Sequence, residues 1–147
     1  MDPKHINPEL YKKIVGVLPI SCVDSVIVHG NSFLLGKRAN KPAKGQWFII
    51  GGRVWKGESL ENAVKRHVKT ETGAANVKIK KFLTTVATIF KDSAQGPSSH
   101  TINSVFLVEA KSKKFVATKE NKELKWFSSI DKNWHPYVKN VLKLAGF

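Results

Sequence analysis

The strongest restriction on the fold comes from a segment between two glycines, GGRVWKGESLENAVKRHVKTETG, residues 51–73. Ser59 is a favourable helix N-cap, because its hydroxyl can accept a hydrogen bond from a free N–H group of the first turn. Gly73 suits the left-handed residue that ends many helices. Between them, apolar residues recur at the spacing of one helical face: Leu60, Ala63, Val64 and Val68. The segment therefore predicts a loop followed by a helix that buries one side in a core.

One residue of this predicted helix, Glu71, does not suit its position. It lies eleven residues after Leu60, and about 100° of rotation per residue places it about 20° from Leu60, on the apolar face. His67 shares that face one turn earlier. Burial of an unpaired carboxylate is costly, so the site should supply a cation: an arginine, a lysine or a metal ion. Two other interpretations stay open, a frayed helix end that leaves Glu71 in solvent and a purely structural ion pair.

The residues before the helix favour a metal ion. Gly51 and Gly52 follow the apolar stretch WFII, and glycine permits a sharp turn that exposes backbone carbonyl and N–H groups. Arg53 comes next, and Glu58 ends the loop. Mg²⁺ prefers carboxylate, carbonyl and water oxygens, and arginine pairs well with phosphate. The segment thus indicates a diphosphate bound through Mg²⁺.

The surrounding segments indicate an α+β fold. Helices are predicted within residues 6–17, with Asn7 as cap, and within residues 136–146, with Tyr137, Val141 and Leu144 on one side. Strands are predicted at residues 22–28 and 32–38, joined as a hairpin by 29–31, and at 47–50, 77–90, 100–110 and 124–128. Helices at both ends and in the middle argue for a mixed sheet flanked by helices. A chain of 147 residues suits a single domain, residues 1–147.

The composition favours an anionic ligand. Lysine and arginine total 25 against 11 acidic residues, a formal charge of +14, which attracts nucleotides or other polyanions. The lysines are not interleaved with aromatic residues as in a single-strand binding face, so small polyphosphates are favoured over nucleic acid. No apolar run reaches the ~20 residues that span a bilayer, and the N-terminus lacks the layout of a signal peptide. The lone Cys22 excludes an internal disulfide framework and points to core packing and a cytoplasmic location.

With these features in place, the 51–73 segment resembles the Nudix box, G-x5-E-x7-R-E-U-x-E-E-x-G-U, where U is bulky and apolar. Six positions match in register: Gly52, Glu58, Arg66, Val68, Glu71 and Gly73. His67 and Thr70 stand where the family usually has glutamates. The stretch FLLGKRANKPAKGQWFIIGGRVWKGESLENA further resembles the GDP-mannose mannosyl hydrolase subgroup, which also lacks those two carboxylates. The resemblance implies the Nudix fold, a mixed β-sheet between α-helices, with Glu58 and Arg66 orienting the loop and the helix.

The subgroup resemblance also implies a chemistry. Its members are Mg²⁺-dependent hydrolases in which water attacks the anomeric carbon of a GDP-sugar and displaces GDP with inversion. The resemblance assigns Mg²⁺, or Mn²⁺ in its place, to the Gly51 carbonyl and Glu71. Arg38 and Arg53 match arginines that stabilise the leaving diphosphate, a role in which one fixed cation can contribute about 3 kcal/mol. Asp24 matches an acidic residue near the sugar and the base.

The match fails at the general base. Aligned backward from Trp126, Glu120 falls on a metal-binding glutamine and Asn121 on the histidine that acts as base, in a loop before the last strand. Glu120 suits Mg²⁺, but Asn121 cannot take a proton, and a positioned base contributes roughly 10²–10⁴-fold. Three explanations stay open: a shifted alignment in which Glu120 or Glu123 is the base, another base such as His100 near the substrate, or a weak or altered activity.

Three functions are therefore weighed. The first is a hydrolase that cleaves the glycosyl C–O bond of a nucleoside-diphosphate sugar. The second is a Nudix hydrolase that attacks phosphorus, which the missing carboxylates at His67 and Thr70 disfavour. The third is a Nudix-fold module that binds nucleotide or RNA without turnover, which Asn121 keeps open. The subgroup tends to form dimers, so a homodimer is an additional expectation.

Overall fold

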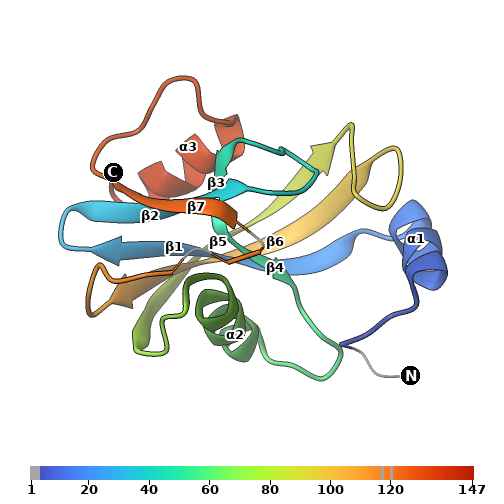
Figure 1. The fold of residues 1–147 in the computed structure, drawn as a ribbon, viewed down its shortest axis with the longest axis horizontal. Coiled ribbons are helices and arrows are strands. Elements are labelled where there is room, and N and C mark those ends of the chain that lie inside the picture. Colours follow the sequence, from blue (N-terminus) through green and yellow to red (C-terminus); the bar gives the residue numbers. More distant parts are fainter. Residues whose placement is uncertain (1–3, 117, 120) are drawn as a thin grey trace.

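The computed structural model describes residues 4–116, 118, 119 and 121–147 (Figure 1). Its helices are α1 (Pro8–Val17), α2 (Leu60–Thr72) and α3 (Pro136–Leu144). Its strands are β1 (Ile20–His29), β2 (Ser32–Arg38), β3 (Trp47–Phe48), β4 (Ile50–Arg53), β5 (Val77–Phe90), β6 (Ser99–Ala110) and β7 (Asn121–Phe127). The expected α+β architecture is confirmed, because a mixed sheet lies between α2 on one side and α3 on the other (Figure 1).

The sheet divides along one edge of β1. Residues Ile27–His29 of β1 pair with β2, whereas residues Cys22–Ser25 pair with β4, both antiparallel. On its other edge β1 runs parallel to β6, and β6 pairs antiparallel with β5. β2 pairs antiparallel with both β3 and β7. Since β2 and β4 leave β1 at neighbouring residues, the sheet opens at this point, and the candidate site lies in the opening.

Each face of the sheet has its own apolar core. On the α3 side, Val26, Phe33 and Val105 pack with Val138, Val141 and Leu142 of that helix. On the α2 side, Val23, Ile27 and Ile50 pack with Ala63, Val64 and Val68. The α2 residues are those of the predicted apolar stripe, so this stripe anchors the helix beside the opening of the sheet.

The helix ends follow the predicted capping residues. The Asn7 side chain accepts hydrogen bonds from the first turn of α1, and the Ser59 hydroxyl accepts one from Asn62 N. Gly73 adopts the left-handed conformation, with φ of 72°. The 32–38 hairpin partner is confirmed. Tyr137 and Val141 are buried, and Leu144 lines one pocket with them although it is 53% exposed.

Three local predictions around the glycines and the last strand are wrong. Residues 47–50 do not form one strand; β3 pairs with β2 and β4 pairs with β1, with Ile49 between them. Gly51 and Gly52 are not in a turn but in β4, paired with Asp24 and Val23. The loop expected at residue 121 is also absent there, because Asn121 opens β7 and pairs with Arg38. Strand pairing, which periodicity does not reveal, decides each of these positions.

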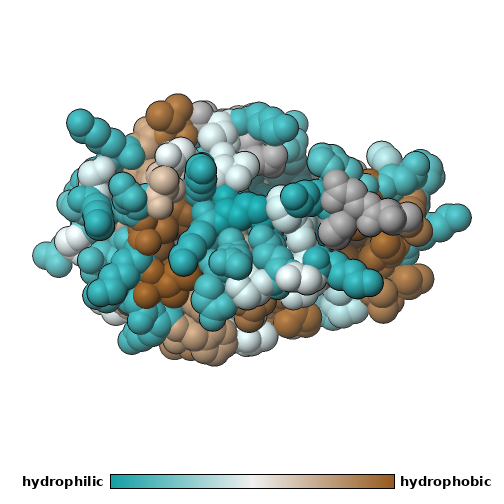
Figure 2. All heavy atoms as spheres, turned by 90° about the horizontal axis from the view of Figure 1, so that it is seen from below, coloured by the Kyte–Doolittle hydropathy of each residue, from teal (hydrophilic) through white to brown (hydrophobic). Residues whose placement is uncertain are grey.

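In the part of the chain that is described, no helix is both long enough and apolar enough to cross a membrane. Figure 2 shows the α2 side of the molecule, where hydrophilic residues cover most of the visible surface and apolar residues gather in smaller patches.

Candidate active site

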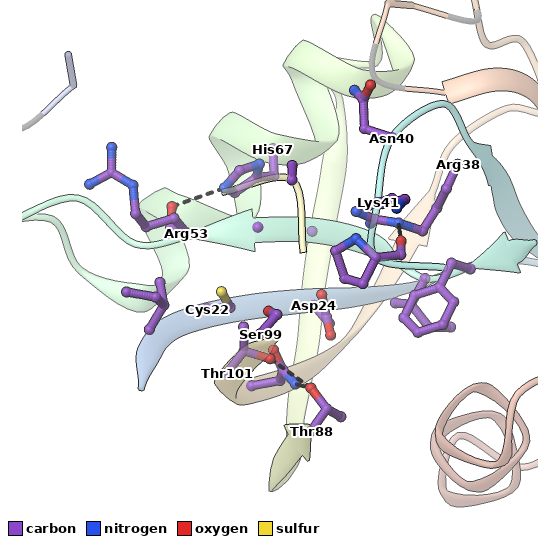
Figure 3. Close-up of a pocket in the computed structure, with 18 of the residues that line it drawn as sticks. Cys22, Asp24, Arg38, Asn40, Lys41, Arg53, His67, Thr88, Ser99 and Thr101 are labelled. Carbon is purple, nitrogen blue, oxygen red and sulfur yellow. Dashed lines mark hydrogen bonds between the residues drawn. The ribbon is translucent and has the colours of Figure 1, made fainter. Parts of the chain in front are cut away.

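A cavity of about 580 Å³ occupies the opening of the sheet. Residues of β1, β4, α2 and β7 line one part of it, β5 and β6 line another, and the segment after β2 borders it with α1. Figure 3 shows Cys22 and Asp24 on the floor, Arg53 and His67 at one side, and Arg38 with Asn40 and Lys41 at the other. The cavity is therefore assembled from segments that are far apart in the sequence.

Glu71 turns toward this cavity and is 7% exposed. His67 Nδ1 lies 3.1 Å from Glu71 Oε1, and Asn121 Nδ2 donates to Oε2 across 3.1 Å. A carboxylate oxygen only accepts, so His67 donates from Nδ1. Glu71 is thus neither frayed into solvent nor paired with a lysine or arginine by any ion pair that the described residues show.

The double glycine is required by close packing rather than by a turn. A Cβ on Gly52 would lie 2.6 Å from His67 Cε1, and a Cβ on Gly51 would collide with the Val23 carbonyl and with Asp24. His67 Nε2 lies 3.1 Å from the carbonyl oxygen of Arg53, the contact dashed in Figure 3. The two glycines therefore let β4 approach β1 and α2 closely enough for His67 to reach the Arg53 carbonyl.

Glu58 and Arg66 form a second cluster at the mouth. Arg66 donates from Nε to Glu58 Oε1 at 2.7 Å and from Nη2 to Oε2 at 2.8 Å, a bidentate pair. Glu58 also accepts from Trp55 N, and Arg66 donates to the Arg53 carbonyl at 3.0 Å. The Arg66 hydrogen bonds lower the pKa of Glu58 from its usual value. This geometry ties the 54–59 loop to α2 and fixes the backbone of Arg53.

Asp24 is the second buried carboxylate of the cavity, 8% exposed. The Tyr137 hydroxyl of α3 donates a short hydrogen bond to Asp24 Oδ2. Burial raises the pKa of Asp24 to about 6, although the Tyr137 hydrogen bond opposes the rise. The same burial raises the pKa of the Cys22 thiol to about 12, so this thiol is packed and protonated rather than reactive.

Cationic side chains border the cavity on two sides. Arg38 and Arg53 both line it, and Arg38 Nε donates to the Pro42 carbonyl at 2.6 Å. The Arg53 guanidinium lies over the Tyr11 ring of α1, 5.6 Å from its centroid. Lys41 also lines the cavity, beside Arg38 (Figure 3). Sequence reasoning missed Lys41, although its place in the segment after Arg38 is a signal that could have indicated it.

The inner wall, from β5 and β6, carries polar residues that sequence reasoning also missed. Asn103 Nδ2 donates to Thr88 Oγ1 at 2.8 Å, and the Thr88 and Thr101 hydroxyls lie 2.6 Å apart. Ser99 lines the cavity beside them. His100 does not: it follows Ser99 and precedes Thr101, so strand alternation directs it to the opposite face of β6. The predicted role of His100 therefore has no geometric support.

Two of the groups predicted to bind a divalent cation, Glu71 and Gly51, lie in the described cavity. The described residues contain no group of three or more histidine, cysteine or acidic side chains arranged around a metal position. Glu71 lines the cavity, and each of its oxygens keeps lone-pair capacity beyond the one hydrogen bond it accepts. Gly51 lines the same part of the cavity. The third predicted ligand, Glu120, lies outside the described residues.

The fold and the site are those of one class of hydrolase. The features that define it are the split sheet, the loop and helix at its opening, and the arginines that border the cavity. Residues 20–141 match the model of the NUDIX domain, and the chain belongs to the Nudix family of hydrolases.

Three similar proteins illustrate the relationship. The low-salt glycan biosynthesis protein Agl8 of Haloferax volcanii is 34% identical over 139 residues, 93% of this chain and 88% of Agl8. An ADP-ribose pyrophosphatase of Methanocaldococcus jannaschii is 36% identical over 109 residues, 74% of this chain and 62% of that protein. The crystal structure of a MutT NUDIX hydrolase from Burkholderia pseudomallei superposes with a TM-score of 0.70 at 26% identity, covering 86% of this chain and 98% of the other.

Proposed function

We propose that the protein is a Mg²⁺-dependent hydrolase of nucleoside-diphosphate sugars, such as GDP-mannose or GDP-glucose, which releases the free sugar and the nucleoside diphosphate. The observation that carries the proposal is the composition of the site around Glu71. His67 and Asn121 donate to its two oxygens where further carboxylates would bind additional metal ions. A site with little negative charge suits a single cation that arrives bound to a diphosphate. It also suits a reaction in which that diphosphate departs from carbon.

The residues of this chain have distinct roles in the proposal. Glu71 and the Gly51 carbonyl would hold the Mg²⁺, for which Mn²⁺ is an alternative, and an ion bound there would supply positive charge to the leaving diphosphate. Arg38 and Arg53, on two sides of the cavity, bind the same diphosphate and meet the negative charge that grows on the departing oxygen. Asn121 orients Glu71 and takes no proton.

The comparisons support a nucleotide-linked substrate, and they leave two candidates for the bond of that substrate that is cleaved. Agl8 is named for glycan biosynthesis, which is in keeping with a sugar-bearing substrate. The archaeal ADP-ribose pyrophosphatase favours the second candidate, attack on phosphorus with release of a nucleoside monophosphate. Asn121, in place of a base, favours a third candidate, nucleotide binding without turnover.

Product identification tests the proposal. The protein is incubated with GDP-mannose, GDP-glucose and ADP-ribose in Mg²⁺, and the products are separated by chromatography. Free sugar plus GDP is expected, and Glu71→Gln should abolish its formation. Glu61→Gln is the matched control, because Glu61 lies on the same helix as Glu71 but is exposed and outside the cavity. Release of GMP, or full activity in Glu71→Gln, would overturn the proposal.

A further inference from the structure

The polar inner wall of the cavity has no assigned role in the chemistry of the diphosphate. It consists of Thr88 on β5 with Ser99, Thr101 and Asn103 on β6. Phe90 is the remaining β5 residue that lines the cavity, so none of the residues contributed by these two strands is charged. Arg38, Lys41 and Arg53 are all on other segments. The cavity thus has a cationic side and a neutral, hydroxyl-bearing side.

The hydrogen bonds of this wall leave one threonine hydroxyl hydrogen and the second amide hydrogen of Asn103 for a ligand. Asn103 donates an amide hydrogen to Thr88, and a single hydrogen bond joins the Thr88 and Thr101 hydroxyls. Two hydroxyl hydrogens are present and this bond uses one of them. Thr88 and Asn103 are buried, at 8% and 5% exposure, and Thr101 is partly exposed. The free hydroxyl hydrogen, with the oxygen lone pairs beside it, therefore points to a ligand that both donates and accepts.

The register of the sheet places this array next to the diphosphate position. Arg53 of β4 and Asn103 of β6 flank Cys22 on opposite sides of β1, in one row across three strands. Two strand spacings separate them, about 10 Å. That distance suits one sugar ring attached directly to the phosphate that Arg53 contacts. A base offers a planar edge with paired donors and acceptors, for which a short hydroxyl array is a poor match.

We infer that Thr88, Thr101 and Asn103 form the subsite for the sugar and discriminate between sugars by the position of their hydroxyl groups. The inference rests on the proposed function. Thr88 holds the array together, because it bonds to both other members. Removal of its hydroxyl leaves the Asn103 amide without its partner inside the cavity, which makes binding of a sugar hydroxyl weaker.

The test measures binding rather than turnover. Dissociation constants of GDP and of GDP-mannose or GDP-glucose are measured by calorimetry in Ca²⁺, with recovery of the intact ligand verified. The parent protein should bind one of these GDP-sugars more tightly than GDP. Thr88→Val and Thr101→Val should each weaken the binding of the GDP-sugar about tenfold, which removes this gain. The affinity for GDP should stay unchanged. Thr85→Val is the control, because Thr85 is on the same strand but exposed and outside the cavity.

A second series identifies the hydroxyl group concerned. Monodeoxy analogues of the preferred GDP-sugar are compared in the parent and in Thr101→Val, which keeps the Asn103–Thr88 bond intact. One analogue should bind to the parent and to Thr101→Val with equal affinity, because it lacks the hydroxyl group that contacts Thr101 in the parent. Additive losses for every analogue would overturn the inference.

Other outcomes are equally decisive. Equal weakening of GDP and GDP-sugar by Thr88→Val would assign the wall to the base or to the structure, and would overturn the inference. A parent protein that binds the GDP-sugar no more tightly than GDP would also overturn the inference. The proposed function is judged separately, by products. If a free sugar forms while the variants keep the binding gain, only the inference fails; if GMP forms while the variants lose that gain, only the proposed function fails.

Discussion

Asn121 donates a hydrogen bond from Nδ2 to Oε2 of Glu71 across 3.1 Å, and so joins the start of β7 to the last turn of α2. The opposite oxygen of the same carboxylate accepts from His67 at 3.1 Å. Two uncharged or weakly basic side chains thus orient the group that is proposed to hold the metal. The relationship also explains why a carboxylate is stable on the inner face of the helix.

Replacement of Asn121 with aspartate tests this contact. Asn121→Asp places a second carboxylate against Glu71, and the repulsion should lower the unfolding free energy by about 1–3 kcal/mol in the absence of metal. Addition of Mg²⁺ should restore part of the loss. Urea unfolding with and without Mg²⁺ measures both effects, and Asn133→Asp, on the exposed segment before α3, is the control. An Asn121→Asp protein as stable as the parent without metal would show that the two side chains are not in contact.

Gly52 should not tolerate a side chain. Gly52→Ala places a Cβ 2.6 Å from His67 Cε1, which forces the imidazole away from Glu71 and costs about 1–3 kcal/mol. Gly16→Ala is the matched control: nothing lies within 4 Å of its added Cβ, and α1 gains a better helix former. Urea unfolding of the two variants compares them directly. Equal stability of the two would contradict the close packing of β4 on α2.

Asp24 should make stability depend on pH. Burial raises the pKa of its carboxyl from 3.8 to about 6, so the folded state binds the proton more tightly than the unfolded state. The resulting stabilisation is complete below 3.8 and is lost as the pH rises through about 6, a change of about 3 kcal/mol. Asp24→Asn should remove this decline, whereas Asp131→Asn, on an exposed turn, should keep it. Unfolding free energies measured across that pH range are the readout; parallel curves for the parent and Asp24→Asn would refute the prediction.

The bordering arginines should act on the reaction more than on the fold. Arg53→Ala and Arg38→Ala each remove one cation from the diphosphate and should lower kcat about 10²-fold. Lys12→Ala, on the exposed surface of α1, is the control for a general loss of positive charge. Steady-state kinetics with the accepted GDP-sugar provides the measurement. A variant of either arginine with the parent kcat would remove that arginine from the site.

The helices and the inward direction of Glu71 can be predicted from the sequence, because they depend on local spacing and capping. Ser59 and Gly73 bound α2 as predicted, and Glu71 lies on its buried face. The partner of Glu71 was predicted only as a cation. His67 shares the stripe in the sequence one turn before Glu71, but its contact with the Arg53 carbonyl depends on the bare Cα of Gly52 in a neighbouring strand.

Features that depend on pairing between distant strands could not be predicted. Thr88 and Asn103 are 15 residues apart in the sequence and meet because β5 and β6 pair in a particular register. The bond between Asp24 and Tyr137 spans 113 residues and requires α3 to cover the sheet. Asn121 was aligned to a catalytic position in a loop, but its pairing with Arg38 makes it part of β7.

The position of an oxygen label after hydrolysis tests the proposed reaction most directly. The protein is given GDP-mannose, or GDP-glucose if that is the accepted substrate, and Mg²⁺ in water enriched in ¹⁸O, and the products are analysed by mass spectrometry. Attack at the anomeric carbon predicts ¹⁸O in the free sugar and none in the GDP. Label in a phosphate group of either product would show attack at phosphorus and would contradict the proposal.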